Sequence, residues 1–195
     1  LLDSYHPIYQ ALELTFAEFN VPLLEKEELE KKIHLSPRNY FKEIFKEQHE
    51  LAEKYFRELY KGISFSNLTL MEGALENLIL LKKKGFPIVL LSNKFSEILK
   101  IEVKKLGVEE FFDNIVGAGD APFTKPHPES LYFTLQNHNV KYNKEQIWYI
   151  GDSVVDMELS HNTNVTGVLY GNNGEGLELF YPFYPDICVK NHYEL

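Results

Sequence analysis

A short polar segment, Ser92-Asn93-Lys94, follows an apolar run and offers groups that could do chemistry. The serine hydroxyl and the backbone N–H groups lie where the chain would enter a helix, and such a helix start can hold an oxyanion or a phosphate group. Serine and asparagine are also favoured as helix N-caps, so the segment could serve only to begin a helix. The sequence leaves both interpretations open.

A pair of carboxylates lies in the segment Gly151-Asp152-Ser153-Val154-Val155-Asp156. If a helix begins near Ser153, Asp156 lies about one turn along and faces the same side as Asp152. Two carboxylates this close repel each other unless a cation lies between them, and hard oxygen ligands favour Mg²⁺. The alternative is that Asp152 or Ser153 caps the helix and that Asp156 is favourable near its positive end.

A lysine between prolines forms the third segment, Thr124-Lys125-Pro126-His127-Pro128. The prolines stiffen the loop and would hold Lys125 in a defined direction. A lysine held in this way could supply positive charge to a transferring phosphoryl group, although a lone lysine is more often a solvated surface charge. His127 carries little weight, because the seven histidines lack a metal-ligand spacing such as H-E-x-x-H.

The elements that must position these segments alternate between apolar runs and helices from residue 67 onward. The run at 87–91 is apolar throughout, which is typical of a strand buried on both faces of a parallel sheet. Further strands are expected at 114–116, 147–150, 167–170 and 187–189, and helices at 73–84, 97–106 and 129–137. This order predicts an open, doubly wound, mainly parallel α/β sheet of the Rossmann-like kind. Ligands bind beyond the carboxyl ends of such strands, so the three polar segments are expected to share one crevice.

Residues 7–60 show a different pattern, in which apolar residues recur at helical spacing, as Ile8, Leu12 and Phe16 do. Prolines bracket a short charged helix that is expected at 25–33. The sequence therefore predicts an all-helical layer of three or four helices ahead of the α/β sheet.

The composition is that of one domain with a small insert. The chain has 195 residues, of which 44% are hydrophobic, and can bury one substantial core. A net charge of −9 with scattered basic residues argues against a nucleic-acid partner. The single cysteine, Cys188, cannot form an internal disulfide, and no apolar run approaches the roughly 20 residues that span a bilayer. A cytoplasmic protein without a membrane partner, monomeric or homodimeric, is expected.

In chain order, the Ser-Asn-Lys segment, the Lys-Pro-x-Pro loop and the strand followed by Gly-Asp-Ser-x-x-Asp resemble motifs two, three and four of the haloacid dehalogenase-like (HAD) hydrolases. The resemblance is closest to the phosphoglycolate phosphatase-like branch. Leu2-Asp3-Ser4 is similar to the end of that family's first motif, Asp-x-Asp-Gly-Thr-Leu-x-Asp-Ser. The resemblance implies that residues 1–4 are a remnant of the first core motif, 5–66 an inserted α-helical cap and 67–195 the HAD α/β core.

The resemblance also implies a Mg²⁺-dependent phosphatase that hydrolyses a small phosphorylated metabolite, a phosphate monoester, through an aspartyl-phosphate. The nucleophilic aspartate is expected just upstream of Leu1 and is absent from this chain. The helical cap would close over the site and exclude water. The alternatives are an inactive fragment or binding protein on the same scaffold, a related phosphomutase, or a dehalogenase. A dehalogenase needs no metal, so the carboxylate pair argues against it.

Four residues are implied to be catalytic: Ser92, Lys125, Asp152 and Asp156. Ser92 would donate to the phosphoryl oxygens, with Asn93 as a further substrate-binding residue, and Lys125 would neutralise those oxygens and orient the nucleophile. Asp152 and Asp156 are the implied metal ligands. Asp152 would bind Mg²⁺, and Asp156 would complete the metal site or hold Lys125.

Overall fold

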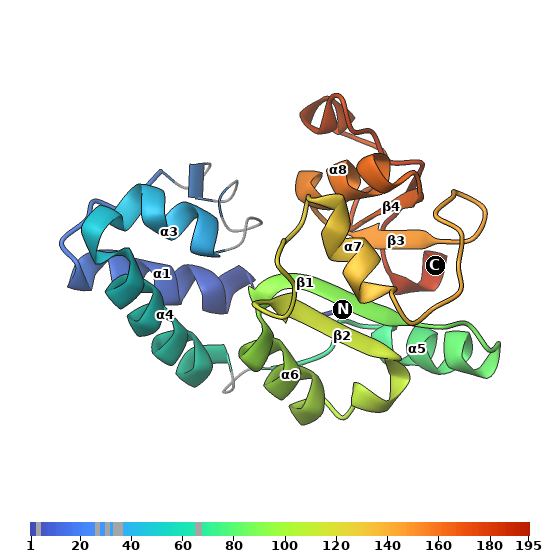
Figure 1. Ribbon diagram of the computed structural model, residues 1–195, viewed down its shortest axis with the longest axis horizontal. Helices are drawn as coiled ribbons and strands as arrows, with labels where there is room; N and C mark the ends of the chain where they lie inside the picture. The colour runs from blue at the N-terminus through green and yellow to red at the C-terminus, as the bar shows by residue number, and fades with distance from the viewer. Residues whose placement is uncertain (3–4, 26–27, 30–31, 33–36, 65–67) are drawn as a thin grey trace.

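The computed structural model describes residues 1–2, 5–25, 28–29, 32, 37–64 and 68–195. Figure 1 shows a helical part, formed by the first third of the chain, beside a larger α/β part. The described strands of the α/β part all pair in parallel, which confirms the predicted fold class. The boundaries predicted for the first motif, the cap and the core stay predictions.

The strands form two parallel ladders. In the first, β1 (Val89–Phe95) pairs with β2 (Asn114–Ala118). In the second, β3 (Trp148–Gly151) pairs with β4 (Thr166–Tyr170), which also pairs with β5 (Ile187–Val189). Among the residues that the structure describes, no ladder joins β1 to β3. Each strand coincides with a predicted apolar run to within a few residues at its ends.

The end of β1 differs from the prediction, because the strand continues past Leu91 to Phe95. Its register with β2 shifts between Leu91 and Phe95, and Phe95 then pairs with Ala118. Phe95 is 4% exposed and packs in the same cluster as the aromatic residues of the helical part, which gives the extended chain a buried anchor. The following helix therefore begins only at Ser96, with Phe95 as its N-cap. The interpretation of the Ser-Asn-Lys segment as a helix cap is wrong.

Helices cover both faces of β1, as a doubly wound sheet requires. Leu90 packs in one cluster with Leu78 and Leu99, whereas Leu91 packs in another with Leu131. This alternation is the period of two that a strand imposes on its side chains. The helices concerned are α5 (Ala74–Lys83), α6 (Ser96–Lys105), α7 (Pro128–Thr134) and α8 (Val154–Thr163). Short 3-10 turns are η1 (Lys46–Gln48), η2 (Glu109–Phe111), η3 (Leu177–Phe180) and η4 (His192–Glu194).

The helical part consists of α1 (Tyr5–Glu18), α3 (Pro37–Phe45) and α4 (His49–Ser64) in the described residues. These helices enclose a buried aromatic cluster, in which the rings of Phe16 and Phe45 meet edge to face with centroids 5.1 Å apart. The predicted helical layer is confirmed there, but the helix expected at 25–33 lies largely outside the described residues. No helix in the described ranges is long and apolar enough to cross a membrane.

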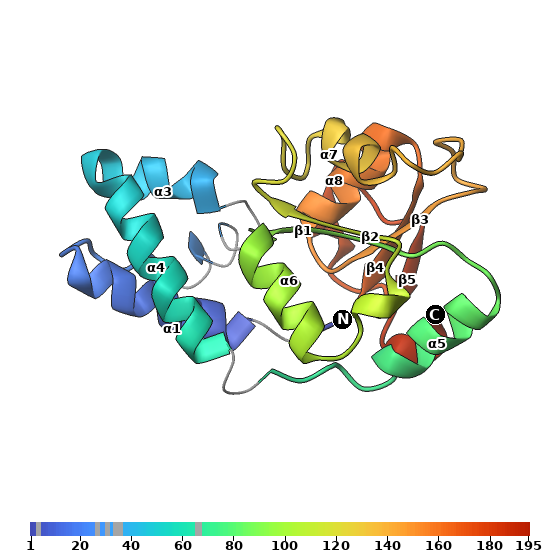
Figure 2. The ribbon, with the colours of Figure 1, turned by 60° about the horizontal axis from the view of Figure 1, so that its bottom comes forward.

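Helix α6 is the element of the α/β part that faces the helical part, as Figure 2 shows. Ile98 of α6 is buried in the same cluster as the aromatic residues of the helical part. Glu97 adds ion pairs across the junction, to Lys61 at 2.7 Å and to Arg57 at 3.7 Å. These ion pairs are partly exposed and each contributes little, so the shared apolar cluster is the main contact between the two parts.

Candidate active site

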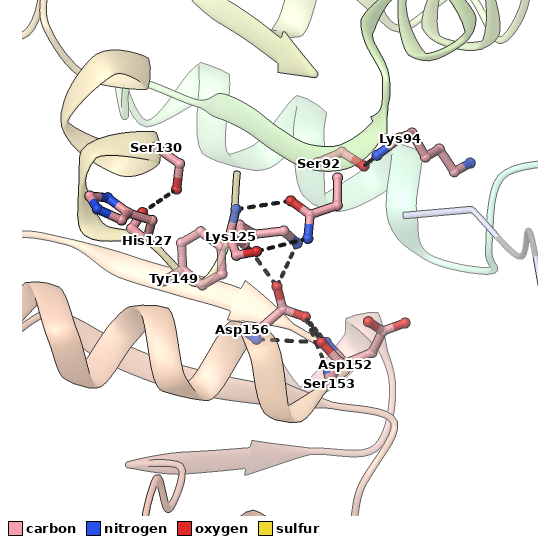
Figure 3. A network of polar contacts seen from close by, with 10 residues as sticks. Ser92, Lys94, Lys125, His127, Ser130, Tyr149, Asp152, Ser153 and Asp156 are labelled. Atoms are coloured by element: carbon pink, nitrogen blue, oxygen red, sulfur yellow. Dashed lines mark hydrogen bonds and ion pairs between the residues drawn. The ribbon is translucent and has the colours of Figure 1, made fainter. Parts of the chain in front are cut away.

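A cavity of about 490 Å³ lies between β1 and β3 and extends past their carboxyl ends to the place where the helical part meets the α/β part. Figure 3 shows the polar network at its base. The structure brings all the residues predicted for the site to this cavity, namely Ser92, Asn93, Lys125, Asp152 and Asp156. The expectation that the three polar segments share one crevice is therefore confirmed. The chemical roles of these residues stay predictions.

Lys125 and Asp156 form a buried ion pair at the base of the cavity. The Nζ atom of Lys125 donates to Oδ1 of Asp156 at 2.7 Å, and the side chains are 13% and 4% exposed. Burial alone would lower the pKa of Lys125, but the Asp156 carboxylate outweighs it and holds that pKa above its ordinary value. Burial would raise the pKa of Asp156, but Lys125 holds it below its ordinary value. Both groups are therefore charged at neutral pH, and Lys125 is not a solvated surface lysine.

The start of α8 fixes the Asp156 carboxylate. Ser153 is the N-cap, its hydroxyl accepts from the Asp156 N–H, and Oδ2 of Asp156 accepts from the Ser153 N–H at 3.1 Å, which completes a capping box. The Asp152 N–H donates to the same oxygen at 3.2 Å. A Cβ atom added at Gly151 would lie 2.3 Å from Cγ of Asp156, so glycine is needed for this close approach. The capping interpretation is correct for Ser153 and Asp156.

Asn93 fixes the backbone of Lys125 from the neighbouring strand. Its Oδ1 accepts from the Lys125 N–H at 2.9 Å, and its Nδ2 donates to the Lys125 carbonyl oxygen at 3.1 Å. Asn93 is 7% exposed. The lysine is therefore held at both ends, by Asn93 at its backbone and by Asp156 at its ammonium group. This arrangement indicates that Asn93 positions Lys125, whereas the sequence predicted that Asn93 contacts the substrate.

Ser92 and Asp152 present the groups that are open to a ligand. Ser92 lies partly exposed on β1, where its Oγ accepts from the Lys94 N–H at 3.2 Å and its O–H can still donate. Asp152 is exposed at the tip of β3. Within the described part of the chain, its carboxylate makes no hydrogen bond or ion pair, and Figure 3 shows it turned away from Asp156.

The donor set at this end of the cavity fits Mg²⁺ through Asp152. Mg²⁺ keeps several water molecules and is commonly held by one or two carboxylates together with a substrate phosphate, so one unpaired carboxylate is an adequate protein ligand. Asp156 fits less well as a direct ligand, because Lys125, Ser153 and the Asp152 N–H already occupy its two oxygens. No group of three acidic, histidine or cysteine side chains arranged to hold a metal occurs among the described residues.

Two further residues of the site were not predicted. Tyr149 of β3 is buried, and its hydroxyl donates to Oδ1 of Asp156 at 3.3 Å. Burial raises the pKa of Tyr149, so it stays a neutral donor. The sequence feature that could have indicated this residue is a tyrosine in a strand predicted to be buried, because a buried tyrosine hydroxyl needs a hydrogen-bond partner. Lys94 belongs to a motif that was recognised, but no role was assigned to it. His127 instead stacks on Phe123 outside the cavity, with ring centroids 3.9 Å apart.

Comparison with protein-family models gives one match over most of the chain. The family described as haloacid dehalogenase-like hydrolase matches residues 1–169. The chain is 28% identical over 117 residues to a phosphoglycolate phosphatase of Haemophilus influenzae, which covers 58% of this chain and 51% of that protein. It is 29% identical over 120 residues to the pyrophosphatase PpaX of Halalkalibacterium halodurans, covering 62% of this chain and 55% of that protein. The matched region thus spans about half the length of these curated relatives.

Solved structures share the fold at low sequence identity. The crystal structure of a β-phosphoglucomutase from Clostridium difficile superposes with a TM-score of 0.84 at 19% identity, over 100% of this chain and 88% of that one. At this identity the similarity shows the fold alone.

Proposed function

The chain belongs to the haloacid dehalogenase-like hydrolases, in their phosphoglycolate phosphatase-like branch, and we propose that it forms most of a Mg²⁺-dependent phosphatase of small phosphate monoesters. The observation that carries this proposal is the meeting of three groups at one cavity: a serine hydroxyl, a buried charged lysine and an aspartate whose carboxylate has no partner within the described residues. A dianionic phosphoryl group needs such donors and positive charges, because catalysis of its transfer rests on positioning and electrostatic stabilisation.

Each group has a separate task in this mechanism. The Ser92 hydroxyl donates to a phosphoryl oxygen, and the Lys125 ammonium neutralises the charge that the phosphoryl oxygens carry during transfer. Asp156 and Asn93 hold Lys125, so that little reorganisation is needed when the substrate arrives. Asp152 would hold Mg²⁺, which offsets the repulsion between carboxylates and phosphate.

The nucleophile belongs, in this proposal, to an aspartate just upstream of Leu1. Leu1 lines the cavity, and its carbonyl oxygen accepts from the Met71 N–H at 3.0 Å. Leu2 forms an antiparallel bridge with Leu70. In this proposal the chain enters at Leu1 beside the cavity, so that a carboxylate a few residues earlier would come within reach of a phosphoryl group bound by Ser92 and Lys125. Attack by that carboxylate would give an aspartyl-phosphate, which water then hydrolyses.

The substrate and cellular setting are also part of the proposal. We expect the substrate to be a small phosphorylated metabolite, since the helical part closes the cavity on one side. Phosphoglycolate is the first compound to test, because relatives of this chain are named phosphoglycolate phosphatases. The single cysteine and the net charge of −9 support a cytoplasmic protein with neither nucleic-acid nor membrane partners. We propose a monomer or a homodimer.

Phosphate release by the full-length protein tests the proposal. We expect hydrolysis of p-nitrophenyl phosphate with Mg²⁺, its loss with EDTA, and its loss in Asp152→Asn. Glu178→Gln, an exposed carboxylate of η3 outside the cavity, is the matched control and should keep wild-type activity. Hydrolysis that survives both EDTA and Asp152→Asn would refute the metal assignment. Binding of phosphate esters without any turnover would instead indicate a binding protein on the same scaffold.

A further inference from the structure

A buried histidine of the cavity wall, His192, has no hydrogen-bond partner for its ring. The residue lies in η4, is 8% exposed and lines the cavity, and the proposed phosphatase mechanism gives it no task. Both ring nitrogens are buried, and neither makes a hydrogen bond within the ranges that the structure describes. Among the described residues, no other side chain has a buried nitrogen or oxygen without a partner. Because leaving such a group unpaired is unfavourable, the ring is expected to have a partner that these residues do not supply.

The main chain around His192 is held from the side of α5. Figure 2 shows the C-terminal end of the chain beside this helix. Nδ2 of Asn77, on α5, donates to the His192 carbonyl oxygen, and the Tyr193 hydroxyl donates to Oε1 of Glu72 at 3.2 Å. A Cβ atom added at Gly73 would lie 3.0 Å from Cβ of His192, so glycine permits this close approach. These contacts fix the position from which the imidazole ring reaches the cavity.

The imidazole ring lies near Leu1, which lines the same cavity. Burial lowers the pKa of His192, and the positive charge at the Leu1 nitrogen lowers it further, so the two groups are close in space. The His192 ring also packs against the ring of Tyr170, with centroids 4.7 Å apart. The Leu1 carbonyl oxygen accepts from the Met71 N–H, which fixes Leu1 beside the histidine. A chain that leads into Leu1 must therefore pass near the two unpartnered nitrogens.

The neutral form of His192 suits a partner that can both donate and accept. At neutral pH the ring is uncharged, so one nitrogen carries a proton and donates while the other accepts. Main-chain peptide groups offer N–H donors and carbonyl acceptors, whereas a phosphate or carboxylate anion offers acceptors alone and would leave one ring nitrogen unpaired. A metal ion is a poorer fit, because no group of three acidic, histidine or cysteine side chains that could hold one occurs among the described residues.

We propose that His192 forms hydrogen bonds with the main chain just upstream of Leu1 and thereby positions the aspartate nucleophile. This inference rests on the proposed phosphatase function, which places that aspartate there. His192 contacts neither the phosphoryl group nor the metal in this scheme, so it is a positioning residue. A nucleophile displaced by about 1 Å can lose about 10²-fold in rate, so a contact that fixes its main chain affects catalysis.

Kinetics of the full-length protein separate a positioning role from a structural one. His192→Leu keeps an apolar side chain of moderate size in the wall but removes both nitrogens. We expect kcat for p-nitrophenyl phosphate to fall by about tenfold or more. KM should stay within about twofold of wild type, because Ser92 and Lys125 still bind the phosphoryl group. An imidazole that lacks a partner in the full-length protein would give the opposite pattern, an unchanged kcat and a higher midpoint of urea unfolding, because leucine removes an unpaired buried polar group.

Conservative variants and a control in the same turn sharpen this comparison. His192→Asn and His192→Gln each restore a donor and an acceptor on one side chain, so at least one of them should recover kcat to within about threefold of wild type. Tyr193→Phe breaks the contact with Glu72 and leaves the His192 ring in place, so it should keep the wild-type kcat.

NMR spectroscopy of the isotope-labelled full-length protein gives a readout that needs no turnover. The imidazole N–H proton of His192 should exchange slowly with solvent and show nuclear Overhauser contacts to residues that precede Leu1. If the wild-type protein releases no phosphate, the proposed function fails, and these contacts still decide whether His192 binds the upstream chain.

Four results would overturn the inference. The first is the absence of Overhauser contacts between the His192 ring and residues that precede Leu1. The second is an unchanged kcat in His192→Leu. The third is the failure of both His192→Asn and His192→Gln to recover kcat. The fourth is a loss of kcat in Tyr193→Phe as large as that in His192→Leu, because the effect would then come from the turn and not from the imidazole ring.

Discussion

Replacement of Asp156 by asparagine should destabilise the protein strongly and abolish its proposed activity. Asparagine has nearly the same shape, and its side-chain oxygen can still accept from the Ser153 N–H, so the capping of α8 is largely kept. What is lost is the charge opposite Lys125, whose side chain is only 13% exposed. Removing one partner of a buried ion pair typically lowers the free energy of unfolding by about 3 to 5 kcal/mol.

The loss of stability is this large because Lys125 would remain charged in a buried environment without the carboxylate of Asp156. It would then lose its proton or draw water into the cavity; the first outcome removes the positive charge intended for the phosphoryl group, and the second screens it. Lys125→Met/Asp156→Asn removes both charges, so it should recover much of the stability but none of the activity. Lys82→Met is the matched control, since it breaks an ion pair with Asp113 whose side chains are 39% and 34% exposed. This control should lower the free energy of unfolding by about 1 kcal/mol at most.

The pH dependence of stability gives an independent check of the same pair. The pKa of Asp156 is lowered in the folded state, so its contribution is present above its ordinary value of 3.8 and is lost as the pH falls through the folded pKa. The pKa of Lys125 is raised, so its contribution is present below 10.5 and is lost only as the pH rises through the folded pKa. The stability difference between wild type and Asp156→Asn should therefore shrink on acidification below 3.8, and it should also shrink as the pH rises toward 10.5, because burial without a partner lowers the pKa of Lys125 in the variant.

Urea denaturation followed by circular dichroism measures these free energies. A loss below about 1 kcal/mol in Asp156→Asn would refute the argument, because it would place the pair in the range of exposed ion pairs. Failure of the double variant to regain stability would show that the aspartate acts through the helix cap and not through Lys125.

Three further substitutions test other parts of the site. Ser92→Ala should lower kcat for p-nitrophenyl phosphate by about 10²-fold or more, while the midpoint of urea unfolding stays close to that of the wild type. An unchanged kcat would exclude the proposed contact between Ser92 and the phosphoryl oxygens. Gly151→Ala should lower the free energy of unfolding by about 1 to 3 kcal/mol, because the new Cβ atom would lie 2.3 Å from the Asp156 side chain. Equal stability of the variant and the wild type would show that α8 can shift freely. Tyr60→Phe should lower it by about 1 kcal/mol or more through the hydrogen bond lost to buried Glu102, and a more stable variant would contradict that contact.

The sequence predicted the features that depend on local pattern. The apolar run at 87–91 indicated a strand buried on both faces, and Val89 and Leu91 do pack on one face while Leu90 packs on the other. The expectation of a helix start near Ser153 is confirmed, and the structure adds a capping box between Ser153 and Asp156. Chain order of the polar segments was enough to predict their convergence, since parallel strands end at the same edge.

The contacts that define the site could not be predicted, because they join residues far apart in the sequence. Lys125 and Asp156 are 31 residues apart, and Tyr60 and Glu102 are 42 apart. The sequence pattern alone allowed either acidic residue of the carboxylate pair to bind a metal. Only the packing shows that both oxygens of Asp156 already accept hydrogen bonds. The extension of β1 to Phe95 likewise depends on a cluster to which the helical part contributes, which no local propensity encodes.

The proposed function depends on transfer of a phosphoryl group in this cavity to an aspartate just upstream of Leu1, and this step can be observed by trapping the phosphorylated enzyme. The full-length protein is mixed with Mg²⁺ and phosphoglycolate, quenched in acid, digested and examined by mass spectrometry. We expect a hydroxylamine-sensitive phosphate on an aspartate in the peptide that precedes Leu1, and its absence in Lys125→Met/Asp156→Asn. A phosphate on any other residue, or hydrolysis that proceeds with no phosphorylated enzyme formed, would contradict it.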